Sequence, residues 1–375
     1  MKSSVVFSLL SCVLSKRYIV QTSNLPDVSV FSSLNTKETF IVGDLVFTIV
    51  ESDTFPVFLY NHNFVESVEE DGVVSIDDYG QFILINDDND FYPEKSYFLQ
   101  NNPPWGLDRA DQKSNMLNNK YYHPVHGGAN VDVYVIDTGI DIKHPEFEGR
   151  ATWGSNFVDN VNTDCNSHGT HVAGTIGSKT FGIAKKTNLV AVKVLNCEGS
   201  GSFSGILASF EYVIKRKQQT KKSSLVNMSL GGGKSNSINR AVAELVKNDI
   251  TVVVAAGNEN QDACNVSPAS AEEAISVGAT SRNNQLASFS NWGKCVNLLA
   301  PGVDIMSTVP GNNSRQLSGT SMASPHVAGY VALVLNENPS LTPNAVKKFL
   351  TTQCTKDVVS GVKHETPNCL MYTIF

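Results

Sequence analysis

The 375-residue chain lacks several features that would assign it to other broad classes of protein. No apolar run reaches about 18 residues, so a membrane-spanning helix is not expected. Basic residues are not in excess, since 29 Lys and Arg stand against 36 Asp and Glu, which argues against a nucleic-acid partner. Charged residues make up 17% and hydrophobic residues 41%, which excludes disorder of the whole chain. The composition therefore indicates an acidic, soluble globular protein.

The N-terminus has the pattern of a secretory signal. Lys2 is followed by an apolar run over residues 5–14, and Ser15 offers a small residue for cleavage. We therefore predict a signal peptide over residues 1–17 and a secreted protein, extracellular or at the cell surface, with the vacuolar lumen as the alternative. The same run has a second interpretation, as a short buried strand of the first domain.

The cysteine count agrees with secretion. Of seven cysteines, Cys12 lies in the predicted signal, which leaves an even number for disulfides. Six cysteines allow 15 pairings, and their spacing alone does not choose among them. Free buried thiols in a reducing compartment are the alternative.

The composition changes along the chain in a way that predicts two domains. Residues 18–95 contain strand-like segments, many acidic residues and no cysteine. The sequence Asn101-Asn102-Pro103-Pro104 then interrupts any regular element and is interpreted as a linker. We predict a small domain over residues 18–95 and a large one over residues 96–375.

The large domain alternates between two periodicities. Unbroken apolar runs, typical of buried parallel strands, occur at residues 131–136, 189–195, 225–230 and 250–256. Helical spacing occurs between them, at residues 206–214 and 238–246. This alternation predicts an α/β fold, a doubly wound parallel sheet with helices on both of its faces.

Three polar residues stand where such strands end and such helices begin. Asp137 follows a predicted strand, His168 lies in the first turn of a predicted helix, and Ser321 opens another. In open α/β sheets these positions converge on one crevice. A serine hydroxyl becomes nucleophilic when an imidazole takes its proton and a carboxylate orients that imidazole. Backbone N–H groups at the start of the Ser321 helix can stabilise an oxyanion.

Taken singly, each residue has a simpler interpretation. Asp137 is typical of a turn before Thr-Gly, and Ser321 of a helix N-cap. His168 and His171 could form a metal-binding pair, although the glutamate of a His-Glu-x-x-His site is absent. The chain order Asp, His, Ser is more specific, and it is the order found in subtilisin.

The surrounding sequence resembles the three signatures of subtilisin-like serine peptidases. The matching segments are Asp137-Thr-Gly, His168-Gly-Thr-His-Val-Ala-Gly and Gly319-Thr-Ser-Met-Ala-Ser-Pro-His-Val-Ala-Gly. The resemblance spans roughly residues 103–350, and Pro104-Trp-Gly-Leu resembles the proteinase K branch. It implies Asp137 as the orienting acid, His168 as the general base, Ser321 as the nucleophile and Asn258 as a side-chain oxyanion donor.

The resemblance also implies how a substrate is held. Two backbone rails, Gly199-Ser200-Gly201 and Ser229-Leu230-Gly231, would pair with an extended peptide as an added strand does. Ala256 and Gly257 would form pocket walls, and no cluster of acidic residues is evident around them, which argues against specificity for paired basic residues.

Family members with cysteines in the same segments imply two disulfides and leave the third pair by elimination. The expected pairs are Cys165–Cys197, Cys264–Cys295 and Cys354–Cys369. Asn297 stands where the proteinase K branch has an aspartate that holds calcium. Since Ca²⁺ prefers carboxylates, calcium binding there is doubtful, and no cofactor or catalytic metal is expected.

Residues 18–95 resemble the I9-type inhibitory propeptide of these peptidases, a small α+β domain. We expect the domain to be removed near residues 92–102; an independent binding domain is the alternative. The chain is thus interpreted as a monomeric, secreted serine endopeptidase that acts on peptides or proteins through an acyl-enzyme and is made as a self-processing zymogen. The alternative is a self-cleaving pseudo-protease that acts as a binding or coat protein.

Overall fold

A computed structural model describes residues 15–26, 28–31, 34–76, 79–81, 91–94 and 97–374. The chain divides into two compact units, one of Met1–Ile41 with Leu45–Asp71 and one of Val42–Asp44 with Gly72–Phe375. The apolar part of the predicted signal lies outside the described residues.

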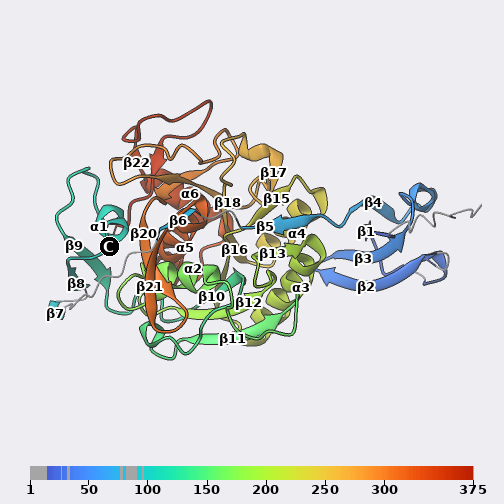
Figure 1. The fold of residues 1–375 in the computed structure, drawn as a ribbon, viewed down its shortest axis with the longest axis horizontal. Coiled ribbons are helices and arrows are strands. Elements are labelled where there is room, and N and C mark those ends of the chain that lie inside the picture. Colours follow the sequence, from blue (N-terminus) through green and yellow to red (C-terminus); the bar gives the residue numbers. More distant parts are fainter. Residues whose placement is uncertain are drawn as a thin grey trace, which may run out of the picture. The chain divides into compact units, whose positions relative to one another are not determined.

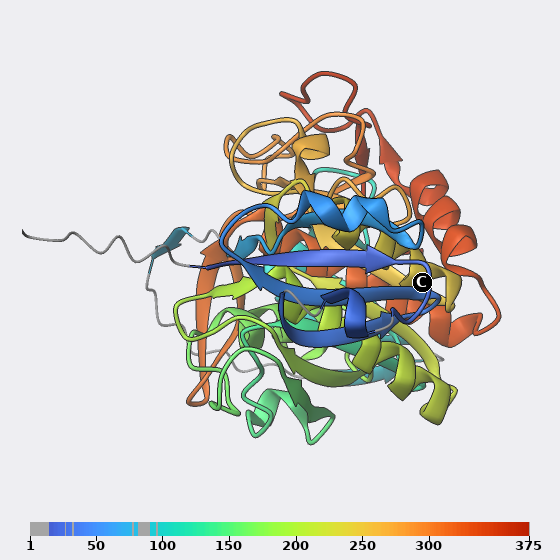
Figure 2. The ribbon, with the colours of Figure 1, turned by 90° about the vertical axis from the view of Figure 1, so that its right-hand side faces the viewer.

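The first unit contains a four-stranded sheet in the order β2-β3-β1-β4, drawn in blue in Figure 2. The strands are β1 (Lys16–Thr22), β2 (Asn35–Val42), β3 (Leu45–Ser52) and β4 (Val65–Glu70). Strand β1 pairs antiparallel with both β3 and β4. In the described residues, the helical part of the expected α+β domain consists of two 3-10 helices, η1 (Val28–Phe31) and η2 (Val57–Asn61). Side chains that include Tyr18, Val20 and Leu59 form the core of this unit.

The second unit is built on the parallel sheet that the sequence predicts. Its nine strands run in the order β11-β12-β10-β14-β16-β18-β19-β23-β22. The strands are β10 (Val131–Asp137), β11 (Ala151–Asn156), β12 (Asn188–Lys193), β14 (Ser223–Met228), β16 (Ile250–Ala255), β18 (Ile275–Thr280), β19 (Leu298–Pro301), β22 (Thr355–Lys356) and β23 (Cys369–Leu370). Only the β22–β23 pair is antiparallel among these described strands.

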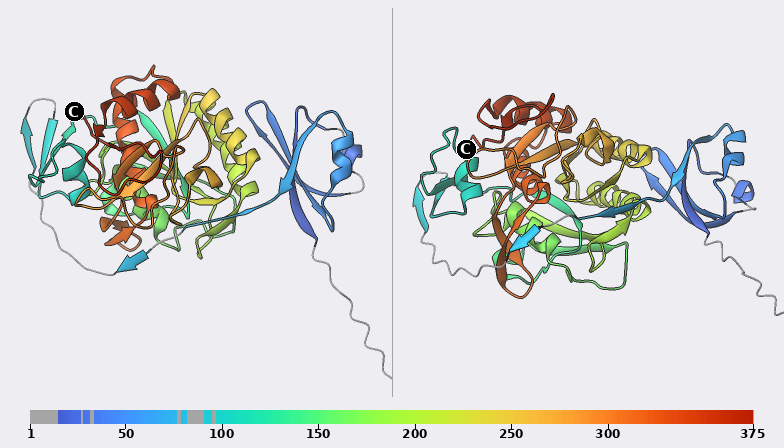
Figure 3. Two further views of the ribbon diagram at one scale, coloured as in Figure 1. Left: turned by 90° about the horizontal axis from the view of Figure 1, so that it is seen from above. Right: turned by 45° about the horizontal axis from the view of Figure 1, so that its top comes forward.

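Helices cover this sheet in two layers (Figures 1 and 3). Helices α2 (His168–Gly177) and α5 (Thr320–Glu337) pack together and share a core with alternate residues of β10, such as Val133 and Val135. Helices α3 (Phe203–Thr220) and α4 (Asn236–Lys247) pack against each other and against β10 and β16. Because side chains alternate across a strand, these two pairs of helices take opposite faces. The two remaining helices are α1 (Trp105–Ala110) and α6 (Pro343–Gln353).

Three smaller sheets surround the large one. The first, in the order β13-β5-β15-β17, contains β5 (Val73–Ser75), β13 (Ser200–Ser202), β15 (Gly231–Gly233) and β17 (Val266–Ser267). The second contains β6 (Tyr79–Gln81), β20 (Ile305–Val309) and β21 (Asn313–Ser318). The third contains β7 (Phe91–Glu94), β8 (Tyr97–Asn101) and β9 (Lys120–Pro124). Two 3-10 helices are η3 (Pro145–Phe147) and η4 (Ala263–Asn265).

Three disulfides join Cys165 to Cys197, Cys264 to Cys295 and Cys354 to Cys369, the pairs expected from the sequence. Cys165 lies three residues before α2, and Cys197 lies just after β12. Among the helices of the described residues, none is both long and apolar enough to cross a membrane.

Candidate active site

A buried acid–imidazole pair lies at the carboxyl end of the parallel sheet. Asp137 is the last residue of β10, and His168 is the first residue of α2. Asp137 Oδ1 and His168 Nδ1 are 2.7 Å apart, and neither side chain is exposed. The backbone N–H of Thr138 donates a second hydrogen bond to the same carboxylate oxygen, at 2.7 Å. The carboxylate is therefore fixed, and it holds one ring nitrogen of the histidine.

Two glycines of the motifs allow the close approach between these elements. A Cβ on Gly169 would lie 2.1 Å from the carbonyl oxygen of Gly139, closer than real Cβ atoms approach backbone. Gly139 itself has a φ of +110°, in the region that favours glycine. Gly169 is thus required by the close contact, and Gly139 by its backbone conformation.

Asp164 orders the loop before α2, and sequence reasoning did not find it. Its side chain is buried, and it accepts hydrogen bonds from Thr138 Oγ1 at 2.9 Å and from Thr170 Oγ1 at 2.6 Å. It also accepts from the backbone N–H groups of Asn166 and Ser167. An aspartate four residues before the histidine, near a helix start, is the only sequence signal for it.

Ser321 is the second residue of α5, and it lies beside one of the expected rails. Its Oγ donates to the carbonyl oxygen of Ser229 at 3.2 Å, and Ser229 Oγ donates to the carbonyl oxygen of Ser321 at 2.8 Å. Since α5 packs against α2, the helices that carry Ser321 and His168 are direct neighbours. The structure therefore brings the serine, the histidine and the Ser229 rail to one end of the sheet.

Asn258 is held by the residue that precedes the serine. Its Oδ1 accepts hydrogen bonds from the backbone N–H of Thr320 at 2.8 Å and from Thr320 Oγ1 at 2.9 Å. Thr320 Oγ1 in turn accepts from the N–H of Gly257 at 3.1 Å. With its carbonyl oxygen engaged, the amide presents its nitrogen as the donor end.

Asn291 fixes the loop that carries Asn258, and it too was missed from sequence. The fully buried amide donates from Nδ2 to the carbonyl oxygen of Ala256 at 2.9 Å. Its Oδ1 accepts from the N–H groups of Glu259 at 3.2 Å and Gln261 at 2.9 Å. Its own N–H donates to the carbonyl oxygen of Gly257. The pocket wall at Ala256 and Gly257 therefore depends on a residue far away in sequence.

His171 is held by backbone carbonyl groups of a neighbouring hairpin. Its Nε2 lies 3.0 Å from the carbonyl oxygens of both Ile305 and Arg315, which ties α2 to β20 and β21. Burial lowers the pKa of His171 to about 3. Among the described residues, no group of three or more His, Cys, Asp or Glu side chains could hold a metal ion.

Asn297, the position considered for calcium, takes part in strand packing. Its Oδ1 accepts from the N–H of Ser276 at 2.9 Å, and its own N–H donates to the carbonyl oxygen of Ser276. This amide oxygen therefore has a protein donor already.

One expected rail borders, through Gly231, a cavity of about 260 Å³. Gly231–Gly233 form one side, and Gly257 and Glu259 lie on another. Gly199, Ser200 and Gly201 form the second rail in β13 and the turn before it. Glu259 gives this cavity a carboxylate that the sequence analysis did not place there.

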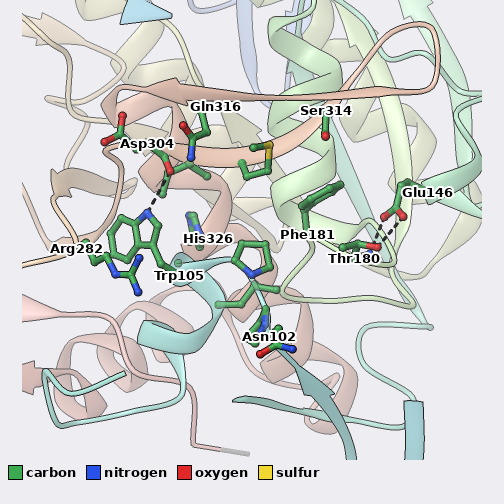
Figure 4. A pocket seen from close by; sticks show the side chains of 16 residues that line it. Asn102, Trp105, Glu146, Thr180, Phe181, Arg282, Asp304, Ser314, Gln316 and His326 are labelled. Atoms are coloured by element: carbon green, nitrogen blue, oxygen red, sulfur yellow. Dashed lines mark hydrogen bonds between the residues drawn. The ribbon is translucent and has the colours of Figure 1, made fainter. Parts of the chain in front are cut away.

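A larger cavity, of about 300 Å³, is shown in Figure 4. Trp105 Nε1 donates to the backbone carbonyl oxygen of Asp304, and Glu146 accepts hydrogen bonds from Thr180. Among the described residues that line it, none belongs to the predicted catalytic set. Its lining includes Pro103 and Pro104, so the expected linker packs within the second unit, next to α1.

An Asp–His pair at the end of a parallel strand, with a serine at the start of a packed helix, is the arrangement expected of an α/β serine peptidase. The profile of the subtilase family, peptidase family S8, matches residues 128–366, and the chain belongs to this family.

Similar proteins agree with this assignment. Cerevisin from Saccharomyces cerevisiae is 47% identical over 299 residues, which cover 73% of this chain and 47% of cerevisin. The cuticle-degrading protease of Metarhizium anisopliae is 45% identical over 73% of this chain and 71% of its own length. The crystal structure of a cold-adapted subtilisin-like serine proteinase matches with a TM-score of 0.70 and 44% identity, covering 73% of this chain and 99% of that one. The chain therefore spans about half of cerevisin and more of the shorter relatives.

Proposed function

We propose that this chain is a secreted serine endopeptidase that hydrolyses peptide bonds through an acyl-enzyme and matures by cutting its own precursor. The observation that carries the proposal is the buried 2.7 Å contact between Asp137 and His168, with Ser321 on the adjoining helix. The names of the similar proteases support it.

The proposed reaction assigns one role to each group. Asp137 holds the His168 ring so that its other nitrogen accepts the hydroxyl proton of Ser321. Ser321 Oγ then bonds to the substrate carbonyl carbon, while the Asn258 amide and backbone N–H groups at the start of α5 stabilise the oxyanion. The histidine gives its proton to the leaving amine, and water releases the acyl group. All of these groups belong to the chain, so we propose that no cofactor is required.

Secretion and the propeptide belong to the same proposal. The three disulfides favour an oxidising compartment, which is the secretory route and its extracellular or vacuolar destinations. Strand β1 begins at Lys16, within the predicted signal of residues 1–17, so cleavage after Ser15 rather than after Arg17 would leave this strand complete. We propose that the segment over residues 18–95 inhibits the enzyme until it is removed, and that the mature enzyme is a monomer acting on peptide or protein substrates. The pseudo-protease alternative is disfavoured, because the Asp, His, Ser and Asn set is complete.

The test is the Ser321→Ala variant, with the exposed Ser114→Ala as its control. The first variant is expected to lose about 10⁶ in kcat on casein and to remain an uncut precursor, while the control is cut and active. Normal processing of purified Ser321→Ala would contradict self-processing. Casein hydrolysis at the wild-type rate would contradict the assignment of the nucleophile.

A further inference from the structure

A third cavity, of about 230 Å³, shares no lining residue with the catalytic set or the rails. It lies where the paired strands β8 and β9, the end of η3 and the loop between α2 and β12 come together. Its described lining consists of Phe98, His123, Glu148, Lys179, Lys185 and Lys186.

Lys185 has an unusual environment for a charged side chain. Only 3% of the residue is exposed, and its Nζ donates one hydrogen bond, to the carbonyl oxygen of Thr180 at 3.3 Å. The same atom lies 5.4 Å from the centre of the Tyr121 ring. Among the described residues, no carboxylate forms an ion pair with it. Because an ammonium group can donate three hydrogen bonds, most of its capacity is unused.

Lys193 shows how this chain buries a lysine elsewhere. It is fully buried, and its Nζ donates to the carbonyl oxygens of Thr138 at 2.9 Å and Leu195 at 2.6 Å. The same atom lies 3.6 Å from Oδ2 of Asp159. Buried charges are normally paired and hydrogen-bonded in this way. Lys185 has a cavity beside it where Lys193 has a carboxylate.

The charges around the cavity favour an anion. Glu148 is the one carboxylate in its described lining, and Oε2 of Glu148 is shared between Lys186 at 3.4 Å and Arg150 at 3.7 Å. Lys179 and Lys185 have no ion-pair partner among the described residues. An anion in the cavity would therefore gain a coulombic attraction that a neutral molecule would not.

The rest of the lining is aromatic. Phe98 and His123 are cross-strand partners on β8 and β9, and their ring centroids are 5.7 Å apart. The His123 ring also stacks with Tyr121, at 5.9 Å. Burial lowers the pKa of His123 to about 3, so this ring is neutral near pH 7. Such a surface suits a flat apolar group better than a hydrated inorganic ion.

We propose that this cavity binds a small organic carboxylate that carries an apolar ring. The ammonium of Lys185 is the counter-ion of the carboxylate, and the rings of Phe98 and His123 contact the apolar part. The site is additional to the proposed peptidase activity and does not depend on it.

Binding should be coupled to protonation of Lys185. Burial lowers its pKa to about 7, and charged neighbours adjust this value. Two carboxylates raise the pKa and two cations lower it: Glu146, Glu148, Arg150 and Lys186. The facing rings of His123 and Tyr121 stay neutral around pH 7, because burial lowers the pKa of the first and raises that of the second.

The sign of the pH dependence follows from this coupling. A bound carboxylate favours the charged lysine, so the pKa of Lys185 rises on binding. Below pH 7 the lysine is already protonated, and above pH 7 it must take up a proton when the carboxylate binds. The affinity should therefore fall by about tenfold between pH 6 and pH 8.

Calorimetry on the full-length Ser321→Ala precursor tests the site with three probes: benzoate, its neutral isostere benzamide, and inorganic phosphate. We expect benzoate to bind at one site with uptake of about half a proton at pH 7, measured in buffers of different ionisation enthalpy. Its affinity should exceed that of the other two probes by about tenfold or more. Equal binding of benzamide would contradict the role of the charge, and equal binding of phosphate would contradict the role of the rings. No binding of benzoate, or an affinity that is constant between pH 6 and pH 8, would overturn the proposal.

A matched pair of lysine variants locates the binding. Lys185→Met removes the ammonium and keeps an apolar stem, so it should melt no lower than its parent, because a buried charge without a partner is destabilising. It should weaken benzoate binding by about tenfold or more and abolish the proton uptake. Lys234→Met, at an exposed lysine outside the lining, should change neither. Unchanged benzoate binding in Lys185→Met, or an equal loss in Lys234→Met, would refute the site. A lower melting temperature of Lys185→Met would contradict the absence of a partner for this lysine.

Discussion

Replacing Cys165 and Cys197 with serine removes the disulfide nearest the catalytic histidine. The two cysteines are 32 residues apart, and the chain-entropy relation assigns such a loop about 3.7 kcal/mol of stability. The pair Cys354 and Cys369 is 15 residues apart, for which the same relation gives about 3 kcal/mol. The two double variants should therefore lose similar amounts of stability. They differ in which part of the fold loses its disulfide.

Their expected effects on activity differ. Asn166 Nδ2 donates to the carbonyl oxygen of Cys197 at 2.9 Å, so the first disulfide and this hydrogen bond together hold the loop that leads into His168. We expect the loss of the Cys165–Cys197 disulfide to lower kcat/KM on a peptide substrate. The loss of Cys354–Cys369 should leave kcat/KM near the wild-type value. The second disulfide joins the region of β22 and β23, at the far edge of the sheet order.

Stability is measured in a Ser321→Ala background, so that self-digestion does not interfere. Either double variant should lower the melting temperature of the peptidase unit by roughly 6–15 °C. A loss of less than about 1 kcal/mol for the Cys165–Cys197 variant would refute the loop argument. Equal kcat/KM in the two double variants would refute the role of the first disulfide in holding His168.

Three further results are expected. Asn258→Ala should lower kcat by roughly 10²–10³ with little change in KM, as measured on a peptide amide; an unchanged kcat would exclude Asn258 as an oxyanion donor. The isolated segment 18–95 should inhibit the mature enzyme in a titration, and no inhibition at micromolar concentration would count against its role. Burial lowers the pKa of His171 to about 3 and that of His326 to about 4. As the pH falls below about 6.5, these two histidines therefore take up protons in the unfolded chain but remain neutral in the folded chain. Stability should therefore fall from about pH 6.5 toward pH 4, and a flat denaturation midpoint of the Ser321→Ala precursor over that range would show the burial argument to be wrong.

Local sequence patterns predicted the central strands of the large sheet and the segments that carry the candidate site. The apolar runs at 131–136, 189–195, 225–230 and 250–256 correspond to β10, β12, β14 and β16, because a strand buried on both faces needs apolar side chains at every position. Motif segments and their order along the chain pointed to Asp137, His168 and Ser321. The structure places these residues at the ends of the expected elements.

Other parts of the site depend on partners far away in sequence. Asp164 accepts a hydrogen bond from the distant side chain of Thr138, and Asn291 forms hydrogen bonds with the distant backbone of the loop that carries Asn258. Neither residue stands in a sequence pattern of its own. Residues 65–76 read as one strand-rich segment, yet Val65–Glu70 belongs to the first sheet while Val73–Ser75 pairs with residues more than 120 positions later. Nothing in the composition of 65–76 marks this division.

The sequence by itself determined the fold class, the candidate catalytic residues and the even number of cysteines outside the predicted signal, because each follows from local side-chain patterns. Only the tertiary structure decided which segment lies between the rails and in which register. Strand addition uses backbone groups that every residue possesses, so its register leaves little trace in side-chain identity.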